Sequence, residues 1–249
     1  MTAESAPKGR PVHGGGRPEG SPPPPRFYVT YTFYKLDNAF RRESADRRIA
    51  MVSEFQTHLE TAARKIQIHS YSTAGFRPDC DFLIWRISPD MADLNNAAVE
   101  TRHTQLGAFL TTPHSFLAQT RRSIYVDQHQ HPGQEGTRLY IKPSEAKYLF
   151  VYPFWKTHEW YQLPMPERQK MMDEHIAVGH KYPNIKINTT YSFGLDDQEF
   201  VVAFEGDNPA EFLDLVMELR HSKARPYTLR DTPIFTCIRK SFRELCGEF

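Results

Sequence analysis

Three reactive side chains lie between Tyr148 and Pro183, on a strand-like run and the helix-like run that follows it. The stretch reads YLFVYPFWKTHEWYQLPMPERQKMMDEHIAVGHKYP and contains Tyr152, Lys156 and His175. A phenol can donate a hydrogen bond or be oxidised to a radical, and a lysine ammonium can hold a carboxylate as a point charge. An imidazole can ligate a metal ion. The stretch has neither a phosphate-binding loop nor a zinc motif, so the chemistry must follow from geometry and context.

His175 lies on the apolar side of the predicted helix. Met171, His175, Val178 and Tyr182 fall at i, i+4, i+7 and i+11, so they share its inward stripe. His180 lies on another side of the helix and does not complete an i, i+4 metal clamp. Two interpretations follow for His175: a hydrogen-bonded core histidine, or a single imidazole ligand to a cofactor metal.

Tyr152 ends its predicted strand, and Lys156 lies in the loop that leaves it. The structural interpretation is an aromatic residue at the edge of the core beside a solvated lysine. The chemical interpretation is an oxidisable phenol beside a cation that binds carboxylates. Trp160 could form the wall of a flat macrocycle or pack in the core, and spacing alone leaves these alternatives open.

The composition is that of a globular chain with balanced charge. Hydrophobic residues make up 39% of the 249 residues, and 31 basic residues face 30 acidic ones. This balance argues against a general nucleic-acid or anionic-membrane surface. Cys80, Cys237 and Cys246 lack CxxC spacing, which favours reduced thiols and excludes a covalent CxxCH haem site.

The first 26 residues differ in composition from the remainder of the chain. Residues 1–26 contain Gly-Gly-Gly and Pro-Pro-Pro-Pro runs, so we predict a disordered tail without the apolar segment of a secretory signal. No stretch approaches the roughly 20 apolar residues of a membrane span. We therefore predict a cytoplasmic protein.

After the tail, the chain repeats one order of elements. Residues 26–36, 66–72, 80–88 and 115–126 read as strands, with helical patterns after the first and third, and the same order recurs in residues 146–249. The letters repeat as well, since YSTAGFRPDCDFLIWRISPDMADL aligns with TYSFGLDDQEFVVAFEGDNPAEFL. Each half has the βαββαβ order of ferredoxin-like folds.

Two such sheets can cover each other and form a barrel with helices outside. We predict an α+β fold with two tandem ferredoxin-like repeats in one continuous module. The expected segments are the tail (1–26), a first repeat with its connecting loop (27–145) and a C-terminal repeat (146–249).

Four stretches of the second half contain uncommon words in a specific order. They read YPFWKTHEWYQLP, EHIAVGHKYP, NTTYSFGLDDQEFVVAFEGDNPAEFLDLVMELR and YTLRDTPIFTCI. In these stretches the chain resembles the chlorite dismutase family, which includes the coproheme decarboxylases, and the likeness is dense over residues 146–240. The resemblance implies a ferredoxin-like barrel with haem in the C-terminal half, iron ligation by His175, and a homo-oligomer, often a pentamer.

The resemblance also implies a reaction. Coproheme carries four propionates where haem b carries two, and the decarboxylases remove two of them as CO2 with hydrogen peroxide. Tyr152 lies 23 residues before His175, as the radical-forming tyrosine does in that pattern. Tyr152 and Lys156 would then be catalytic. The implied porphyrin contacts are Lys156, Trp160, Met172 and Asn188.

Asn188 bears on which family member the chain resembles. Members that split chlorite carry a distal arginine thirteen residues after the proximal histidine, and here that position is Asn188. Without a guanidinium over the iron, a transient hypochlorite would be poorly held. The sequence therefore predicts negligible chlorite turnover.

Two departures from the family pattern concern the surroundings of the iron. Relatives usually place an acidic residue near LRETEAS, where it can accept the second N–H of the proximal imidazole, and here the stretch is LRHSKAR. Some decarboxylases also use a distal histidine base. His129 and His131 are the nearest candidates, and the alternative is an ordinary exposed loop.

Three functions remain as hypotheses. The first is a coproheme decarboxylase that uses haem iron, a porphyrin substrate and hydrogen peroxide. The second is a chlorite dismutase or haem peroxidase. The third is a non-catalytic haem-binding protein, against which Tyr152 and Lys156 argue.

Overall fold

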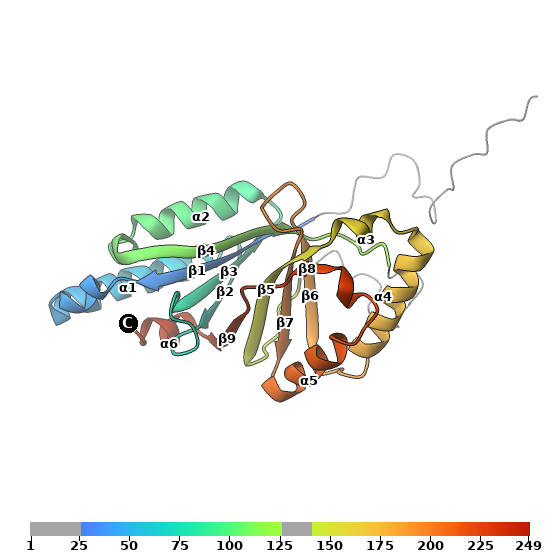
Figure 1. Ribbon diagram of the computed structural model, residues 1–249. Coiled ribbons are helices and arrows are strands. Elements are labelled where there is room, and N and C mark those ends of the chain that lie inside the picture. The colour runs from blue at the N-terminus through green and yellow to red at the C-terminus, as the bar shows by residue number, and fades with distance from the viewer. Residues whose placement is uncertain (1–25, 126–140) are drawn as a thin grey trace, which may run out of the picture.

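In the computed structural model, the described residues are 26–125 and 141–249. They form an α+β fold in which helices lie outside a large antiparallel sheet (Figure 1). The elements of the first half are β1 (Tyr28–Leu36), η1 (Asn38–Arg42), α1 (Ala45–Ala62), β2 (Gln67–Ser72), β3 (Phe82–Ser88), α2 (Met91–His103), η2 (Leu106–Phe109) and β4 (Leu110–Gln119). Those of the second half are β5 (Tyr148–Lys156), α3 (His158–Gln162), α4 (Met165–Gly179), β6 (Lys186–Tyr191), β7 (Phe200–Gly206), α5 (Pro209–Leu219), η4 (Arg225–Tyr227), β8 (Thr228–Arg230), β9 (Phe235–Lys240) and α6 (Phe242–Cys246).

The sheet closes on itself. Its strand order is β7-β6-β4-β1-β3-β2-β9-β5-β8, and β7 also pairs with β5, so every strand except β8 belongs to a ring. In each half the first strand lies between the third and the last, and the second strand pairs with the third. The halves meet where β2 pairs with β9 and where β4 meets β6.

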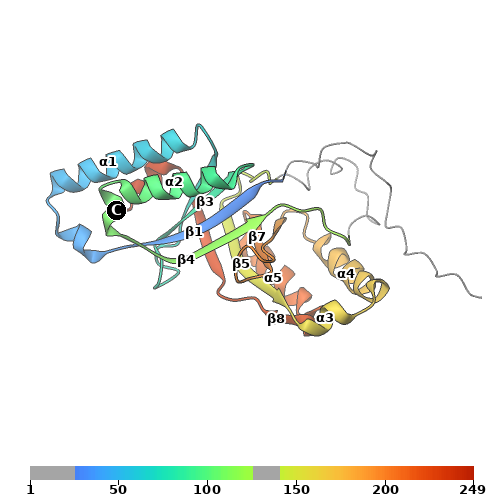
Figure 2. The ribbon, with the colours of Figure 1, turned by 90° about the horizontal axis from the view of Figure 1, so that it is seen from above.

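Apolar side chains fill the inside of this ring. Alternate residues of the strands point inward and form one buried cluster, which includes Tyr31, Trp85, Val151, Val201 and Ala203. Two further clusters lie between the sheet and the helices, one in each half. Figure 2 shows α1 and α2 side by side over the first half, and α4 and α5 beside the sheet of the second. No helix within residues 26–125 or 141–249 is long and apolar enough to cross a membrane.

The structure confirms an α+β fold and shifts one predicted strand. We expected residues 115–126, whereas β4 spans Leu110–Gln119. Pro113 lies inside this strand, where the pairing with β1 loses register between Phe33 and Lys35. A proline lacks the N–H that a regular ladder needs, and a bulge accommodates it. The predicted tail lies almost wholly outside the described residues.

The C-terminal helix crosses from the second half to the first. Leu245 and Cys246 of α6 are buried in the same cluster as Phe55 of α1. A capping box at Ser241 and Glu244 fixes the start of this helix. The last residues therefore pack on the first half, although our boundary grouped them with residues 146–249.

Candidate functional site

Strand β5 divides its side chains between the barrel interior and the helices. Val151 belongs to the interior cluster, whereas Phe150, Tyr152 and Phe154 face the third cluster, which lies between the sheet and the helices of the second half. Val178 of α4 packs against that same cluster. The alternation of the strand therefore places Tyr152 in the space between the sheet and the helix that carries His175.

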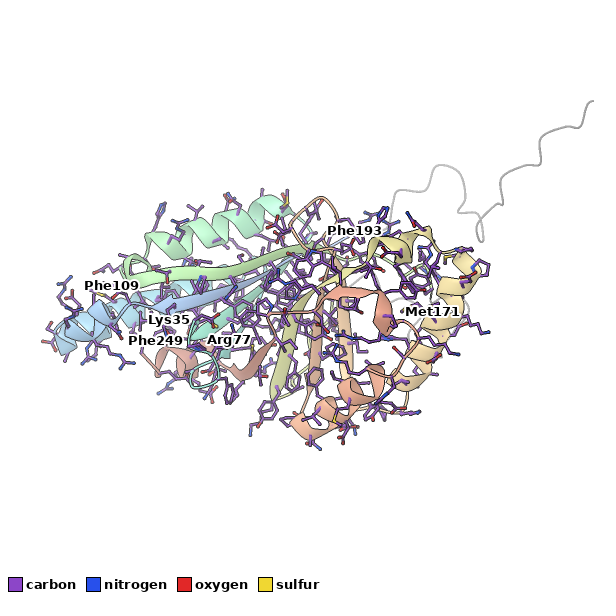
Figure 3. All side chains as sticks on the ribbon, viewed as in Figure 1. Lys35, Arg77, Phe109, Met171, Phe193 and Phe249 are labelled. Atoms are coloured by element: carbon purple, nitrogen blue, oxygen red, sulfur yellow. The ribbon has the colours of Figure 1, made fainter. Side chains whose placement is uncertain are left out.

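His175 is partly buried on α4, one turn after Met171. Figure 3 labels Met171 on the side of α4 that faces the sheet. Burial, together with the nearby Lys156 ammonium, lowers the pKa of His175 to about 4. The imidazole is thus neutral at physiological pH, with a lone pair available to a metal.

The His175 ring is not part of a hydrogen-bond network with the described residues. No hydrogen bond joins it to any side chain or backbone group in residues 26–125 or 141–249. Over the same residues, no group of three or more His, Cys, Asp or Glu side chains could hold a bare metal ion. A single neutral imidazole of this kind fits an iron that a macrocycle already carries.

Lys156 lies beside His175 at the end of β5. Its Nζ is 4.2 Å from the ring centroid of Trp160 and 3.4 Å from the carbonyl oxygen of Ala224. Burial and the nearby Arg225 lower the pKa of Lys156 to about 8, against the opposing effect of the Glu199 carboxylate. The site therefore contains a cation that little else neutralises.

Glu199 holds the backbone of this corner. Its Oε2 accepts hydrogen bonds from the backbone N–H of Lys156 at 2.7 Å and from the Tyr161 hydroxyl at 2.6 Å. One carboxylate thus connects the end of β5 to α3, the helix that carries Trp160. The arrangement fixes where the Lys156 side chain begins.

Tyr152 is partly buried, and its ring stacks on Phe204 with centroids 5.9 Å apart. Burial and the nearby Asp231 carboxylate raise the pKa of the phenol, and Arg220 and Arg225 act in the opposite direction. The phenol therefore keeps its proton at neutral pH. It also lies near charged residues that sequence reasoning missed.

These charged residues form an ion-pair cluster. Asp231 Oδ2 accepts a hydrogen bond from Arg220 Nη1 at 2.5 Å and another from Arg225 Nη1 at 2.6 Å. Both arginines lie in the LRHSKAR stretch, where the family pattern predicts an acidic residue. The only sequence signal for this cluster is that Arg220 and Arg225 precede the Arg230-Asp231 pair, and this signal is weak.

The structure does not bring Asn188 to the site, so its assignment as a porphyrin contact is wrong. Asn188 is paired with Ala203 of the interior cluster, and its Nδ2 donates to Glu205 Oε1 at 2.6 Å inside the barrel. Strand parity places its neighbours Ile187 and Thr189 on the face toward α4 instead. None of the six residues of β6 is an arginine.

The remaining predicted residues have mixed positions. Met172 is partly buried on α4, and Trp160 is only 2% exposed, with its ring under the Lys156 ammonium. In the LRHSKAR stretch, Lys223 binds Glu174 of α4, through its backbone N–H at 3.2 Å and its Nζ at 3.6 Å. His129 and His131 lie outside the described residues.

Sequence comparison shows which protein family has this arrangement. The chlorite dismutase family model matches residues 48–240. The chain belongs to the chlorite dismutase family. The chain is 30% identical over 223 residues to a coproheme decarboxylase of Mycolicibacterium smegmatis, covering 88% of this chain and 94% of that protein.

Two solved structures share the fold. A mutant chlorite dismutase from Candidatus Nitrospira defluvii is similar with a TM-score of 0.82 at 22% identity, over 89% of this chain and 94% of that one. A haem-binding protein from Thermus thermophilus has a TM-score of 0.78 at 21% identity, with the same coverage. At these identities the likeness establishes the fold, and family membership supports haem as the cofactor.

Proposed function

We propose that this protein is a coproheme decarboxylase, which uses hydrogen peroxide to convert Fe-coproporphyrin III to haem b. One observation carries the proposal: His175 lies near Lys156, on the helix whose Val178 packs against the same cluster as Tyr152, and its ring makes no hydrogen bond with residues 26–125 or 141–249. The similarity to a coproheme decarboxylase supports it.

The residues of this space fit an iron porphyrin. His175 would ligate the metal from α4, and the apolar side chains Met171, Ile187 and Val202 would contact the macrocycle. Ile187 is 45% exposed, although it lies on the face toward α4, so the residues around it do not fill this space. When bound, the iron porphyrin supplies the activation of peroxide and the oxidising equivalents.

The chain's own residues position the substrate and move a proton. Lys156 provides a partly desolvated ammonium for a propionate carboxylate. Tyr152 Oη would give up its proton, together with an electron, toward the peroxide that the bound cofactor reduces to water, and would recover both as a hydrogen atom from a propionate β-carbon, whose carboxyl group then leaves as CO2. Trp160 and Glu199 hold Lys156 in place.

Product mass tests this proposal. We expect the protein, mixed with ferric coproheme and peroxide, to yield two successive mass losses, each of one CO2 together with two hydrogens, as a propionate becomes a vinyl group and one peroxide is reduced to water. Coproheme recovered unchanged, with the porphyrin bound, would contradict the proposal and support a haem-binding protein without this activity.

We further propose an arrangement, assembly and location for the chain. The equal strand orders of the two halves support tandem ferredoxin-like repeats, divided near residue 145. We propose a homo-oligomer, a pentamer, which light scattering would measure. All three cysteines are buried free thiols, which supports a cytoplasmic location.

A further inference from the structure

The segment from Arg220 to Asp231 lies alongside the end of β5 that carries Tyr152 and Lys156. β8 pairs with β5 at Trp155 and Lys156, and the Ala224 carbonyl accepts a bond from Lys156 Nζ. Asp231 directly follows β8. The backbone pairing therefore holds Arg225 and Asp231 at the Tyr152 end of the site.

Asp231 binds both arginines through a single oxygen. Arg220 and Arg225 each use one Nη1 atom on Asp231 Oδ2, at 2.5 Å and 2.6 Å. A guanidinium has five N–H donors, and we find no other side-chain acceptor for either arginine among residues 26–125 and 141–249. Each arginine thus keeps donors for a further anion.

The charges in this corner do not cancel. Lys156, Arg220 and Arg225 are cations, and Glu199 and Asp231 are the carboxylates beside them. Among these five groups the cations exceed the carboxylates by one, in a partly buried place where a carboxylate would be held strongly. Two guanidiniums held on one carboxylate oxygen bring their remaining N–H donors to the same corner, and such donors recognise a carboxylate.

We propose that Asp231 is a positioning residue, which fixes Arg220 and Arg225 as a two-armed receptor for a porphyrin carboxylate at the Tyr152 end of the site. The inference rests on the proposed function, because it takes the substrate to be a porphyrin with four carboxylates. The receptor selects that substrate over a porphyrin with two, since the product lacks the carboxylates beside Tyr152.

Binding of metal-free porphyrins tests the inference without any turnover. The probes are coproporphyrin III, with four carboxylates, and protoporphyrin IX, with two, each titrated by fluorescence. We expect Asp231→Asn to weaken coproporphyrin III binding about tenfold and protoporphyrin IX binding no more than about twofold, because two unfixed guanidiniums lose their shared geometry. Asp231→Glu should restore most of the difference.

The sign of the effect separates positioning from simple charge. Asp231→Asn removes a negative charge and so makes the corner more positive by one. If the Asp231 carboxylate merely neutralised the arginines or competed for their N–H groups, its removal would make the porphyrin bind more tightly. Tighter binding, no change, or equal weakening of both porphyrins would each overturn the inference. Arg225→Lys, which keeps the charge and loses the planar fork, should also weaken coproporphyrin III selectively.

A matched control exists in the first half. Asp79 accepts bonds from Arg77 at 2.5 Å and from His114 at 2.8 Å, so Asp79→Asn breaks a comparable ion pair far along the chain from the site. It should leave both affinities unchanged, and thermal melting should show that each variant is folded. A protein with Asp231-dependent binding and no CO2 release would refute the proposed reaction while the inference stands.

Discussion

The space between sheet and helices differs between the two halves of the chain. In the first half, Phe55 of α1 and Phe82 of β3 are fully buried, and Ile68 of β2 is 9% exposed. In the second half, Ile187 of β6 is 45% exposed, and His175 on the facing helix is only partly buried. One strand order thus supports a filled interface and an incompletely filled one, and the second contains the reactive side chains.

Polar groups follow the same division. In the first half, Arg86 is fully buried, and its Nη2 donates to the Tyr34 hydroxyl at 3.2 Å and to Thr101 Oγ1 at 3.0 Å. His58 on α1 also contacts Thr101 Oγ1, at 3.0 Å. These side chains are partners of one another, although Arg86 Nε and Nη1 have no hydrogen-bond partner among the described residues. His175 has no such partner within the described residues, so its ring remains available to a ligand.

Tyrosine substitutions in the two halves should have opposite effects. Tyr152→Phe should bind coproheme almost normally and return it unreacted, because only the hydroxyl is lost. Its free energy of unfolding should change by no more than about 1–2 kcal/mol. Tyr34→Phe should leave decarboxylation intact and cost about 1–3 kcal/mol, because it removes a partner of buried Arg86. Product mass and denaturant melts measure both. Normal haem b production by Tyr152→Phe would refute its radical role.

Lys156→Ala should slow the reaction without stopping it. The loss of a carboxylate-binding cation misplaces the propionate, which we expect to reduce the rate by up to about 100-fold while Tyr152 remains in place. Time courses of product mass would show slowed or partial conversion. Lys35→Ala is the control, since Lys35 pairs with Asp81 near the end of the corresponding strand of the first half. An equal loss in both variants would contradict this role.

The filled interface should contribute more to stability than the open one. Phe55→Ala should reduce the free energy of unfolding by about 3–5 kcal/mol, because it leaves a cavity among fully buried side chains. Met171→Ala should cost less than about 2 kcal/mol without porphyrin, because its side chain is already partly exposed. Urea melts of the porphyrin-free protein compare the two. Equal costs would show that the second interface is packed like the first.

The smallest expected effect concerns chlorite. The wild-type protein should release negligible oxygen from it, because β6 carries no arginine toward α4. Thr189→Arg should raise a weak activity, because this side chain faces the helix. Asn188→Arg should not, since that position faces Glu205 inside the barrel. An oxygen electrode distinguishes them, and rapid, lasting release by the wild type would overturn the assignment.

The sequence supports some of these features much better than others. The inward stripe of a helix follows from periodicity, so the place of His175 on α4 could be predicted. The side of β6 on which residue 188 lies depends on strand register, and counting residues from His175 does not determine that register. The Arg220–Asp231–Arg225 cluster depends on a turn and a three-residue strand, which leave no periodic signal. The crossing of α6 likewise follows from tertiary packing.

A spectroscopic titration of two histidine variants tests the central claim most directly. Ferric coproheme is added to the wild type, to His175→Ala and to His58→Ala, which removes a partly buried histidine from the first-half helix α1. We predict that the wild type and His58→Ala give the five-coordinate, histidine-bound spectrum, and that His175→Ala loses it and binds the porphyrin far more weakly. An unchanged spectrum in His175→Ala would contradict the account and assign the iron ligand to another histidine.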